Sequence, residues 1–468
     1  MKMDAVDRAV WHNILTLARL TFSDEGYESL LGAPIVFCSL TNTSVEGEKP
    51  AILIPIDSDD ITLENGWWHV GFGSTHLHCH SLLPCPEGWH GMPNNKTPAW
   101  WVSPKGSLTP AWNFFAIIRG LYLFKEERDS DQRDKHGRFP IEASPRFHSN
   151  LTHVPFINDV VALIIDAALH LQTEDHSLLE GVSDVVLPPV VVLSHDLDNL
   201  TGNSFWTQAG RLHTFIKTAL RFDLSAFRHL GFIFQNILSP ERYYFEDQIR
   251  MWEEEKKYGF PSVAYILNGL EGRFGARTPF KVSKRLCEQA PKEVEFGIHY
   301  NYGVLNTKNG LAKQKAEIDA ILQNPCTSGR AHYLKFNAQE DFLTLIKEGI
   351  DFDESLGWPY QNSYYCGIAG PFAPICPDSG ETLEIIEFPM VFMDNDLPRE
   401  DGTPSCFSAM LEHICQVGGC LSILVHPGAS HNPERLDMEG VYERILADLA
   451  ARGVRSLTPQ DLKQKFLN

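Results

Sequence analysis

The chain has 468 residues, 43% of them hydrophobic, and its 60 acidic and 40 basic side chains give a net charge of −20. The hydrophobic content is ordinary for a globular protein, and the length suits roughly two to four domains. The acidic charge excludes a general nucleic-acid-binding protein and argues against electrostatic docking on an anionic membrane.

The N-terminus and the cysteines bear on the compartment. Residues 1–10 include acidic side chains and lack a long apolar core, so no secretory signal is expected there. No segment approaches the roughly 20 uninterrupted apolar residues of a membrane span. The ten cysteines form no Cys-x-x-Cys pair, which favours free thiols over a disulfide framework. We therefore expect a cytoplasmic protein without a membrane span.

Residues 1–180 are rich in Trp, His and Pro and in short strand-like runs, such as 51–56 and 67–72. Helices are expected at 111–127 and 157–171, and the polar segment 172–184 is the predicted linker. This half is predicted to be a smaller α+β domain, and the sequence assigns it no role. His76, His78 and His80 would share one face of a strand as zinc ligands do, but a half-exposed strand or loop is the favoured interpretation.

The second predicted domain, residues 185–468, alternates strand-like and helix-like segments. Strands are expected at 190–193, 262–267, 295–298, 383–386, 422–425 and 454–457. Helices are expected at 248–258, 311–323, 339–348, 407–417 and 438–452. Such alternation indicates an α/β domain built on a parallel sheet or barrel.

Polar side chains follow several predicted strands of this domain at the points where the strands end, and Arg330 and His332 lie between two of these strands. In α/β barrels this edge carries the chemistry. The residues concerned are Asp196, Asp198, His299, Arg330, His332, Glu387 and His426. One Asp and two His with open coordination positions suit Zn²⁺ or another divalent transition metal. A second carboxylate can take a proton from water, and a remote His can return one to a leaving amine.

Residues 185–468 resemble the polysaccharide deacetylases, the NodB-homology group of carbohydrate esterase family 4, and carry the motifs in that family's order. The resemblance implies a distorted (β/α) barrel. It also implies that Asp196 is the catalytic base and that Asp198 is a metal ligand, as in the family's Asp-x-Asp motif. His299 matches the first His of the His-x-x-x-His motif, which supplies metal ligands.

The later motifs imply the remaining roles. Arg330 matches the Arg that orients the catalytic Asp. His426, in Leu424-Val-His426, matches the general acid of the Leu-x-His motif. Glu387, in Glu387-Phe-Pro389, occupies the place of the motif that supports this His. The first half also resembles the N-terminal region of a sub-branch of deacetylase-like proteins, a region of no assigned function.

One position departs from the family pattern. The family has a second His where this chain has Gly303. His332 is the candidate replacement, because it follows a neighbouring strand and because Arg330-Ala-His-Tyr-Leu334 resembles the same sub-branch. Asn301 is the weaker alternative, through its amide oxygen.

The leading hypothesis is a metal-dependent hydrolase that removes N-acetyl groups from a polysaccharide or sugar precursor, with Asp198, His299 and His332 holding the metal. Zn²⁺ is the first expectation for that ion. The alternatives are a degenerate deacetylase fold that binds glycans without turnover, and a hydrolase of a non-sugar amide. The expected partner is a carbohydrate rather than a nucleic acid, and the sequence leaves the oligomeric state open.

Overall fold

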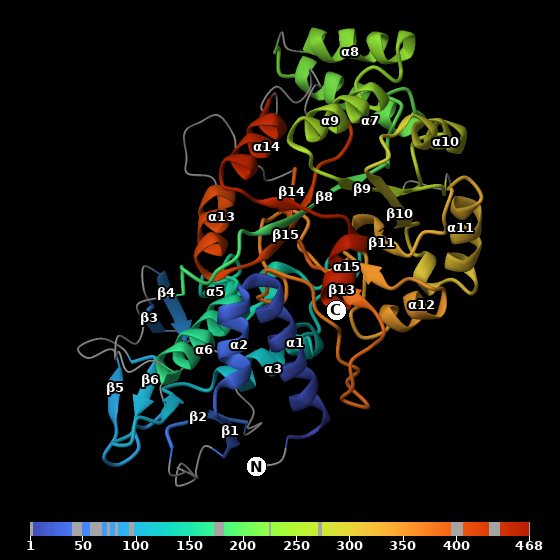
Figure 1. Ribbon diagram of the computed structural model, residues 1–468. Coiled ribbons are helices and arrows are strands. Elements are labelled where there is room, and N and C mark those ends of the chain that lie inside the picture. The colour runs from blue at the N-terminus through green and yellow to red at the C-terminus, as the bar shows by residue number, and fades with distance from the viewer. Residues whose placement is uncertain are drawn as a thin grey trace. The chain divides into compact units, whose positions relative to one another are not determined.

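In a computed structural model, the chain divides into two compact units (Figure 1). The structure describes residues 3–39, 49–56, 68–72, 75–79, 83–92, 98–172, 182–223, 226–269, 274–394, 406–429 and 440–467. Unit 1 comprises Met1–Pro189, Ser363–Pro389 and Ser408–Cys420. Unit 2 comprises Val190–Asn362, Met390–Phe407 and Leu421–Asn468. The predicted boundary near 180–185 assigns 363–389 and 408–420 to the second domain, whereas the structure packs both segments within unit 1.

Unit 1 combines helices with a mixed sheet. Its helices are α1 (Ala5–Thr21), α2 (Asp24–Gly32), α3 (Phe114–Tyr122), α4 (Lys125–Arg128), α5 (Pro145–His148), α6 (Phe156–Gln172) and α13 (Cys406–Val417). Its strands include β1 (Ile35–Cys38), β2 (Ile52–Pro55), β5 (His90–Met92), β6 (Trp100–Val102) and β7 (Leu108–Pro110), which form a sheet in the order β1-β2-β7-β6-β5. The strands β3 (Trp68–Phe72) and β4 (Thr75–Cys79) pair separately and antiparallel. The predicted α+β character is therefore observed.

Helix α6 explains why distant segments of the chain belong to unit 1. Its side chains from Phe156 to Ala168 are all buried. Within this helix, Asn158 accepts the Ala369 N–H at 2.8 Å and donates to the carbonyl oxygens of Ala369 and Gly418, at 3.0 and 2.9 Å. A buried amide must satisfy its hydrogen-bonding capacity. These bonds attach the two later segments to the first part of the chain.

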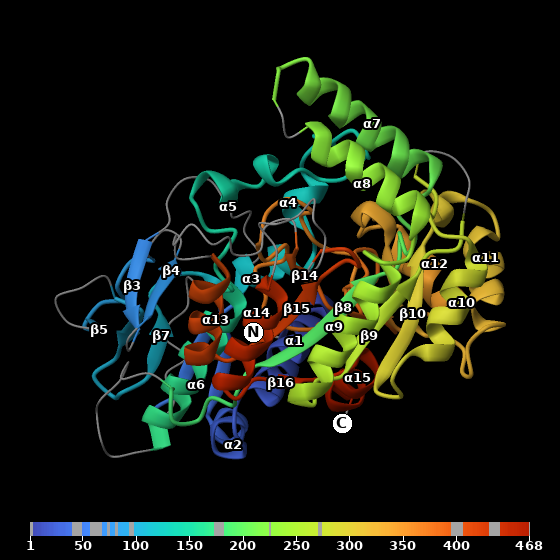
Figure 2. The ribbon, with the colours of Figure 1, turned by 90° about the horizontal axis from the view of Figure 1, so that it is seen from above.

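Unit 2 is an α/β domain. Its helices are α7 (Phe205–Ala219), α8 (Ala226–Leu238), α9 (Phe245–Tyr258), α10 (Phe280–Gln289), α11 (Gly310–Asp319), α12 (Asp341–Lys347), α14 (Val441–Ala451) and α15 (Pro459–Leu467). Its strands are β8 (Val190–Asp196), β9 (Ser262–Ile266), β10 (Val294–Tyr300), β11 (Ser328–Ala331), β12 (Phe352–Asp353), β14 (Met390–Met393), β15 (Cys420–Leu424) and β16 (Arg455–Ser456). Figure 2 shows β8, β9 and β10 side by side.

The sheet of unit 2 runs in the order β12-β11-β10-β9-β8-β15-β14, with β16 beside β8. The pairs β8–β9, β9–β10, β10–β11, β11–β12, β14–β15 and β8–β16 are parallel. All seven residues of β8 are buried, as expected for an apolar strand in the middle of such a sheet. This strand order is that of the predicted distorted (β/α) barrel.

The predicted elements of unit 2 agree with the structure to within a few residues, with one exception. The predicted strand 383–386 is reduced to the two residues of β13 (Ile386–Glu387), in a segment that belongs to unit 1. The predicted linker lies mostly outside the described residues. Every cysteine for which the structure gives a state is a free thiol. No helix among the described residues is long and apolar enough to cross a membrane.

Candidate metal centre and catalytic cavity

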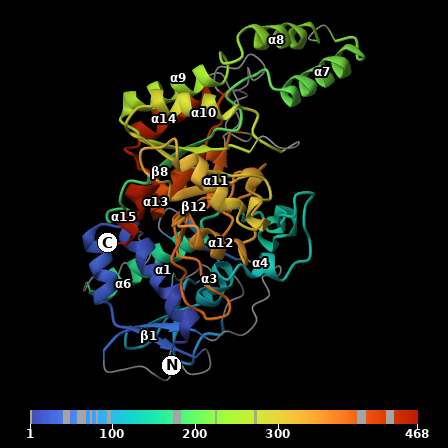
Figure 3. The ribbon, with the colours of Figure 1, turned by 90° about the vertical axis from the view of Figure 1, so that its right-hand side faces the viewer.

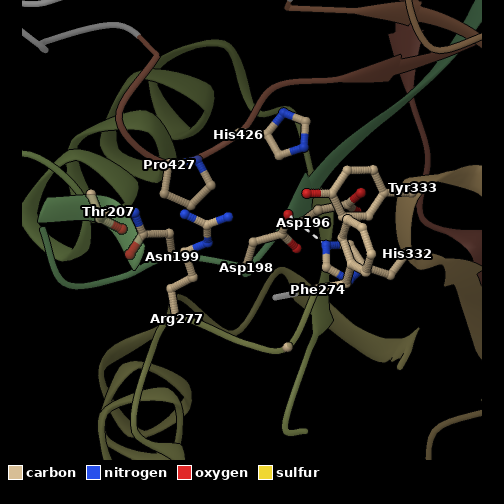
Figure 4. A pocket seen from close by; sticks show the side chains of 11 residues that line it. Asp196, Asp198, Asn199, Thr207, Phe274, Arg277, His332, Tyr333, His426 and Pro427 are labelled. Atoms are coloured by element: carbon tan, nitrogen blue, oxygen red, sulfur yellow. Dashed lines mark ion pairs between the residues drawn. The ribbon is translucent and has the colours of Figure 1, made fainter. Parts of the chain in front are cut away.

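A cavity of about 230 Å³ lies at the carboxyl edge of the unit 2 sheet (Figure 4). Because parallel strands end at the same edge, side chains distant in the sequence meet there. The cavity is lined by Asp196, Asp198, Asn199, Thr207, Phe274, Gly275, Arg277, His332, Tyr333, His426 and Pro427. Four of the seven residues predicted from the sequence are therefore in its wall, and His299 contacts two of those four.

Asp198, His299 and His332 form a compact group that could hold a metal ion, with one ligand atom from each within 4.8 Å of the others. His299 Nε2 lies 3.2 Å from Asp198 Oδ1, and His332 Nε2 lies 3.3 Å from Asp198 Oδ2. Both histidines are buried. Burial raises the pKa of Asp198, but the two histidines outweigh it and hold that pKa well below its usual range. The carboxylate is therefore ionised, as a metal ligand must be.

The hydrogen bonds around this group fit a metal. His299 Nδ1 lies 2.9 Å from the carbonyl oxygen of Arg330, which can only accept, so Nδ1 carries a proton and Nε2 is the ring atom that faces Asp198. The buried Asp198 Oδ1 has His299 Nε2, 3.2 Å away, as its one neighbour among the contacts that the structure gives, and no hydrogen bond of good geometry. A buried carboxylate oxygen without a donor is costly unless a cation approaches it. The donor set, one carboxylate and two imidazoles, is one that Zn²⁺ uses in catalytic sites.

His332 directly follows the end of β11, at the sheet edge where the other residues of the group lie. Its ring and that of His299 have centroids 4.9 Å apart. The next two residues, Tyr333 and Leu334, have φ of 62° and 51°. Residues other than glycine rarely adopt this left-handed conformation, and such strain gathers at functional sites.

Gly303, which stands where the family has its second His, and the nearby Asn301 do not contribute to the group. Gly303 has φ of 75° and begins a short 3₁₀ turn, Val304–Asn306. The Asn301 amide is engaged elsewhere, because its oxygen accepts the Gly269 N–H at 2.9 Å and its nitrogen lies 3.3 Å from Asn268 Oδ1. Neither residue joins the group that His332 completes.

Asp196 is held by Arg330. The guanidinium donates to Asp196 Oδ1 at 2.9 Å and to Ser194 Oγ at 2.8 Å, and it lies 4.8 Å from the centre of the Tyr265 ring. The other carboxylate oxygen, Oδ2, lies 3.6 Å from His299 Nε2. Burial raises the pKa of Asp196, but the positive charges of His299, Arg330 and His426 together lower it by more. The carboxylate is therefore ionised. One oxygen is fixed by Arg330 and the other faces the metal group.

Glu354 is a site residue that the sequence analysis did not find. It is fully buried, lies 3.2 Å from the Arg330 guanidinium and accepts hydrogen bonds from Tyr265 and, at 2.6 Å, from Ser422. Its position directly after β12 is the signal that would have found it. That strand has only two residues and was not predicted.

His426 forms the other side of the cavity. Its Nδ1 lies 2.8 Å from Oδ1 of the buried Asp394. Burial lowers the pKa of His426, but the Asp394 carboxylate more than compensates and raises it to about 9. With this pKa the ring is protonated at neutral pH. Because Nδ1 faces Asp394, the proton on Nε2 is the one available to a bound molecule.

Glu387, which was predicted to support His426, lies in unit 1 and does not line the cavity. Its backbone pairs with that of Phe372. The partner that the structure gives His426 is Asp394, seven residues later, at the end of β14, a strand that the sequence analysis missed. Glu387 therefore has no demonstrated part in the site.

His195 is fully buried and does not line the cavity. Its ring bonds the Val425 carbonyl oxygen and Glu255 Oε1, both at 2.7 Å, and Glu255 also accepts from Tyr442 at 2.6 Å. Because Val425 precedes His426, this contact joins the strand end that carries the Asp pair to the strand end that carries His426.

The remaining lining residues were not predicted. Asn199, Thr207 and Arg277 bring polar groups to one side of the cavity, and Phe274 and Tyr333 bring rings to another (Figure 4). Phe274 and Tyr333 pack edge to face with centroids 5.3 Å apart. Thr207 lies in the first turn of α7, a helix that the sequence analysis did not predict, and Asn199, Phe274 and Arg277 come from loops, where sequence periodicity carries no signal.

No family model and no curated protein matches this sequence. Among solved structures, the chain is similar to a candidate polysaccharide deacetylase from Mycobacterium smegmatis, with 13% identity and a TM-score of 0.39 over 59% of this chain and 91% of that one. It is also similar to the peptidoglycan deacetylase PdaC from Bacillus subtilis, with 12% identity and a TM-score of 0.31 over the same shares of the two chains.

A 4-alpha-glucanotransferase from Thermococcus litoralis is matched at a comparable level, with 11% identity and a TM-score of 0.34 over 60% of this chain and 40% of that one. Likeness at this level therefore extends to proteins with different activities. The activity of this chain has to be argued from the geometry of its own cavity.

Proposed function

We propose that this protein is a metal-dependent hydrolase that removes N-acetyl groups from a saccharide. One observation carries the proposal: a two-His, one-Asp group lies beside an Arg-held carboxylate, Asp196, and the same cavity is lined by a His held protonated by Asp394. Hydrolysis of an amide needs a group that removes a proton from water and a group that protonates the leaving nitrogen. The cavity contains both.

Asp198, His299 and His332 would hold the metal, and Zn²⁺ suits this donor set. When bound, the ion would polarise the amide carbonyl and make the attacking water more acidic. The three protein ligands leave coordination positions free for these oxygens. His299 is fixed in the required tautomer by the Arg330 carbonyl oxygen, so the same residue orients both the ligand and the base.

Asp196 is the proposed base. Arg330 occupies its Oδ1, which leaves Oδ2 to accept a proton from the attacking water. His426 is the proposed acid. Its pKa near 9 keeps the ring protonated at neutral pH, so Nε2 can donate to the leaving nitrogen while Asp394 stabilises the cation at Nδ1. The two groups thus start in opposite protonation states, as hydrolysis requires.

A sugar fits the remaining wall of the cavity. Arg277, Asn199 and Thr207 offer donors to hydroxyl or carboxylate oxygens, while the rings of Phe274 and Tyr333 offer apolar faces. This combination of polar and aromatic groups supports a saccharide over a simple aliphatic amide.

The test combines metal analysis with acetate release. Protein loaded with Zn²⁺ should release acetate from N-acetylated oligosaccharides, and Asp196→Asn should retain the metal but lose at least about a hundredfold in kcat. His413→Ala is a matched control, because His413 is a histidine paired with an Asp in unit 1. Wild type that binds no metal would contradict the ligand assignment.

The same experiment separates the two alternatives. Glycan binding that persists in Asp196→Asn, with no acetate released by wild type, would make the protein a binding module. Hydrolysis of small cyclic or linear amides but of no N-acetylated sugar would make it a non-sugar amidase. The complete set of base, acid and metal ligands favours a working hydrolase over both.

A further inference from the structure

The helices α7 and α8 form a hairpin that stands away from the sheet of unit 2 (Figure 3). Its large apolar side chains are turned outwards. The exposed ones are Phe205, Trp206, Leu212, Ile216, Leu220, Phe222, Phe227, Phe234, Ile237 and Leu238, with exposed fractions from 48% at Trp206 to 95% at Phe222. So many exposed large apolar side chains on one hairpin are typical of an interaction site.

The spacing of these residues shows that the exposure follows a pattern. In α7 and just beyond it, Phe205, Leu212, Ile216 and Leu220 are separated by seven, four and four residues. Residues at such spacings share one face of a helix. In α8, Phe227, Phe234 and Leu238 repeat the seven and four spacing. Each helix therefore presents an apolar stripe to the outside.

The buried side of the hairpin is already filled by other residues. Phe232 of α8 packs with Tyr243 and Tyr244. Arg211 is buried, donates to the Gly202 carbonyl oxygen and to the Tyr244 hydroxyl, both at 2.7 Å, and lies 4.6 Å from the centre of the Phe232 ring. Asn236 is buried too and donates to the Phe232 carbonyl oxygen at 2.9 Å. Because the outward stripes take no part in this packing, they need another surface to cover them.

The charge of the hairpin indicates which surface. Between Asn199 and Pro240 the sequence has four cations, Arg211, Lys217, Arg221 and Arg228, and one acid, Asp223, a local charge of +3 in a chain of −20. A partner should therefore be anionic. Two copies meeting through this hairpin would bring like charges together, which disfavours self-association.

We propose that the α7–α8 hairpin docks the protein on an anionic lipid surface. Aromatic and aliphatic side chains inserted at the headgroup level, with Lys and Arg beside them, are how helices bind such interfaces. The tip suits insertion best, since Leu220 and Phe222 are 76% and 95% exposed and flank the cationic Arg221. The net charge of the whole chain argues against docking on an anionic membrane, but it hides the positive charge of this segment.

Docking would also locate the cavity relative to the lipid. Thr207, in the first turn of α7, lines the cavity, so the hairpin begins at the wall of the proposed active site. The binding proposal does not depend on the proposed activity, because it is tested without a substrate.

The test is co-sedimentation of the full chain with phosphatidylcholine vesicles, with and without phosphatidylglycerol. Wild type should bind the mixed vesicles, bind pure phosphatidylcholine far less, and dissociate as salt is raised. Lys217→Gln with Arg221→Gln should weaken binding about twenty-fivefold, at roughly fivefold for each cation. Leu220→Ser with Phe222→Ser should weaken it by at least about tenfold.

Leu343→Ser is the matched control, because Leu343 is 57% exposed on α12, outside the hairpin. It should bind as wild type does, and every variant should keep the wild-type circular dichroism spectrum and Tm. Failure of wild type to bind mixed vesicles, or hairpin variants that bind as tightly as wild type, would overturn the proposal. A concentration-dependent dimer abolished by Leu220→Ser with Phe222→Ser would assign the hairpin to a second copy instead and overturn it too.

Discussion

Arg330 in unit 2 and Arg146 in unit 1 are both buried guanidiniums paired with carboxylates, yet only the partner of Arg330, Asp196, lines the cavity that Asp198, His332 and His426 share. Arg146 bonds both oxygens of Glu126, at 2.8 and 2.9 Å, and the carbonyl oxygens of Tyr364 and Tyr365. Arg330 bonds Asp196, Ser194 and Glu354. The chemistry of the pairs is nearly the same, so a buried ion pair by itself does not mark an active site.

The two networks differ in whether a carboxylate oxygen remains open to a further ligand. Around Arg146, both Glu126 oxygens are engaged, and Ser144 donates to one of them as well. Around Arg330, Asp196 keeps one oxygen towards the metal group, and the buried Oδ1 of the neighbouring Asp198 has only the ring of His299, 3.2 Å away, beside it. Carboxylate oxygens that are not fully hydrogen-bonded at the wall of a cavity are typical of a site that binds a cation or a substrate.

The largest effect is expected from His332→Ala, which tests whether the open carboxylate oxygens near Arg330 face a bound metal ion. Loss of a ligand should weaken metal affinity by at least about a hundredfold, since residues that only support ligands already contribute ~10–100-fold. Metal content after dialysis is the measurement. Asn301→Ala and Arg146→Met should keep the wild-type content, and loss of metal in Asn301→Ala would contradict the ligand set.

Arg330→Met and Arg146→Met compare the two networks directly. Each should destabilise its unit by about 3–5 kcal/mol, because each leaves carboxylates buried without their partner. Only Arg330→Met should also reduce kcat/KM, by about a hundredfold, since it releases the proposed base. Thermal unfolding and acetate release per folded molecule measure the two effects. Equal loss of activity in both variants would show that the effect is only structural.

Asp394→Asn tests the other wall of the cavity through pH. The pKa of His426 is raised to about 9, so the acid-competent ring is present below that pH and is lost as the pH rises through it. The variant should move this alkaline limb of the kcat profile down towards the ordinary His pKa of about 6.5, with a loss of about thirtyfold near pH 8.

The free energy of unfolding should also decrease as the pH rises through the pKa of His426. A raised folded-state pKa contributes stability that is complete below the unfolded value near 6.5 and is lost through about pH 9. Asp394→Asn should remove this contribution, and Glu387→Gln should leave the alkaline limb in place. A limb that moves in Glu387→Gln instead would restore the role first predicted for Glu387.

Arg277→Met should give the smallest effect, on substrate binding alone. Its guanidinium lines the cavity but does not touch the proposed base or acid in any contact that the structure gives. KM for a saccharide should rise about five- to tenfold with kcat nearly unchanged, because a charged hydrogen bond to the sugar is lost. A fall in kcat with constant KM would place Arg277 in the chemistry instead.

The sequence predicted several of the longer elements well because they carry periodicity, although it missed the helices α1, α7 and α8. The strand 190–193 and the helices that end at Tyr258 and Val417 are within a few residues of the structure. It missed β11, β12 and β14, which have two to four residues each, too few for alternation to appear. The missed strands position His332, Glu354 and Asp394, which is why two of these three site residues went unnoticed.

The parallel α/β character of the second half and most of the residues at its strand ends could be predicted from the chain alone, because alternation of elements and motif order are local properties. Which of those residues meet became visible only in the folded molecule. There His332 joins Asp198 and His299, His426 pairs with Asp394, and residues 363–389 pack within unit 1. These outcomes depend on the folding of distant segments, which no local pattern records.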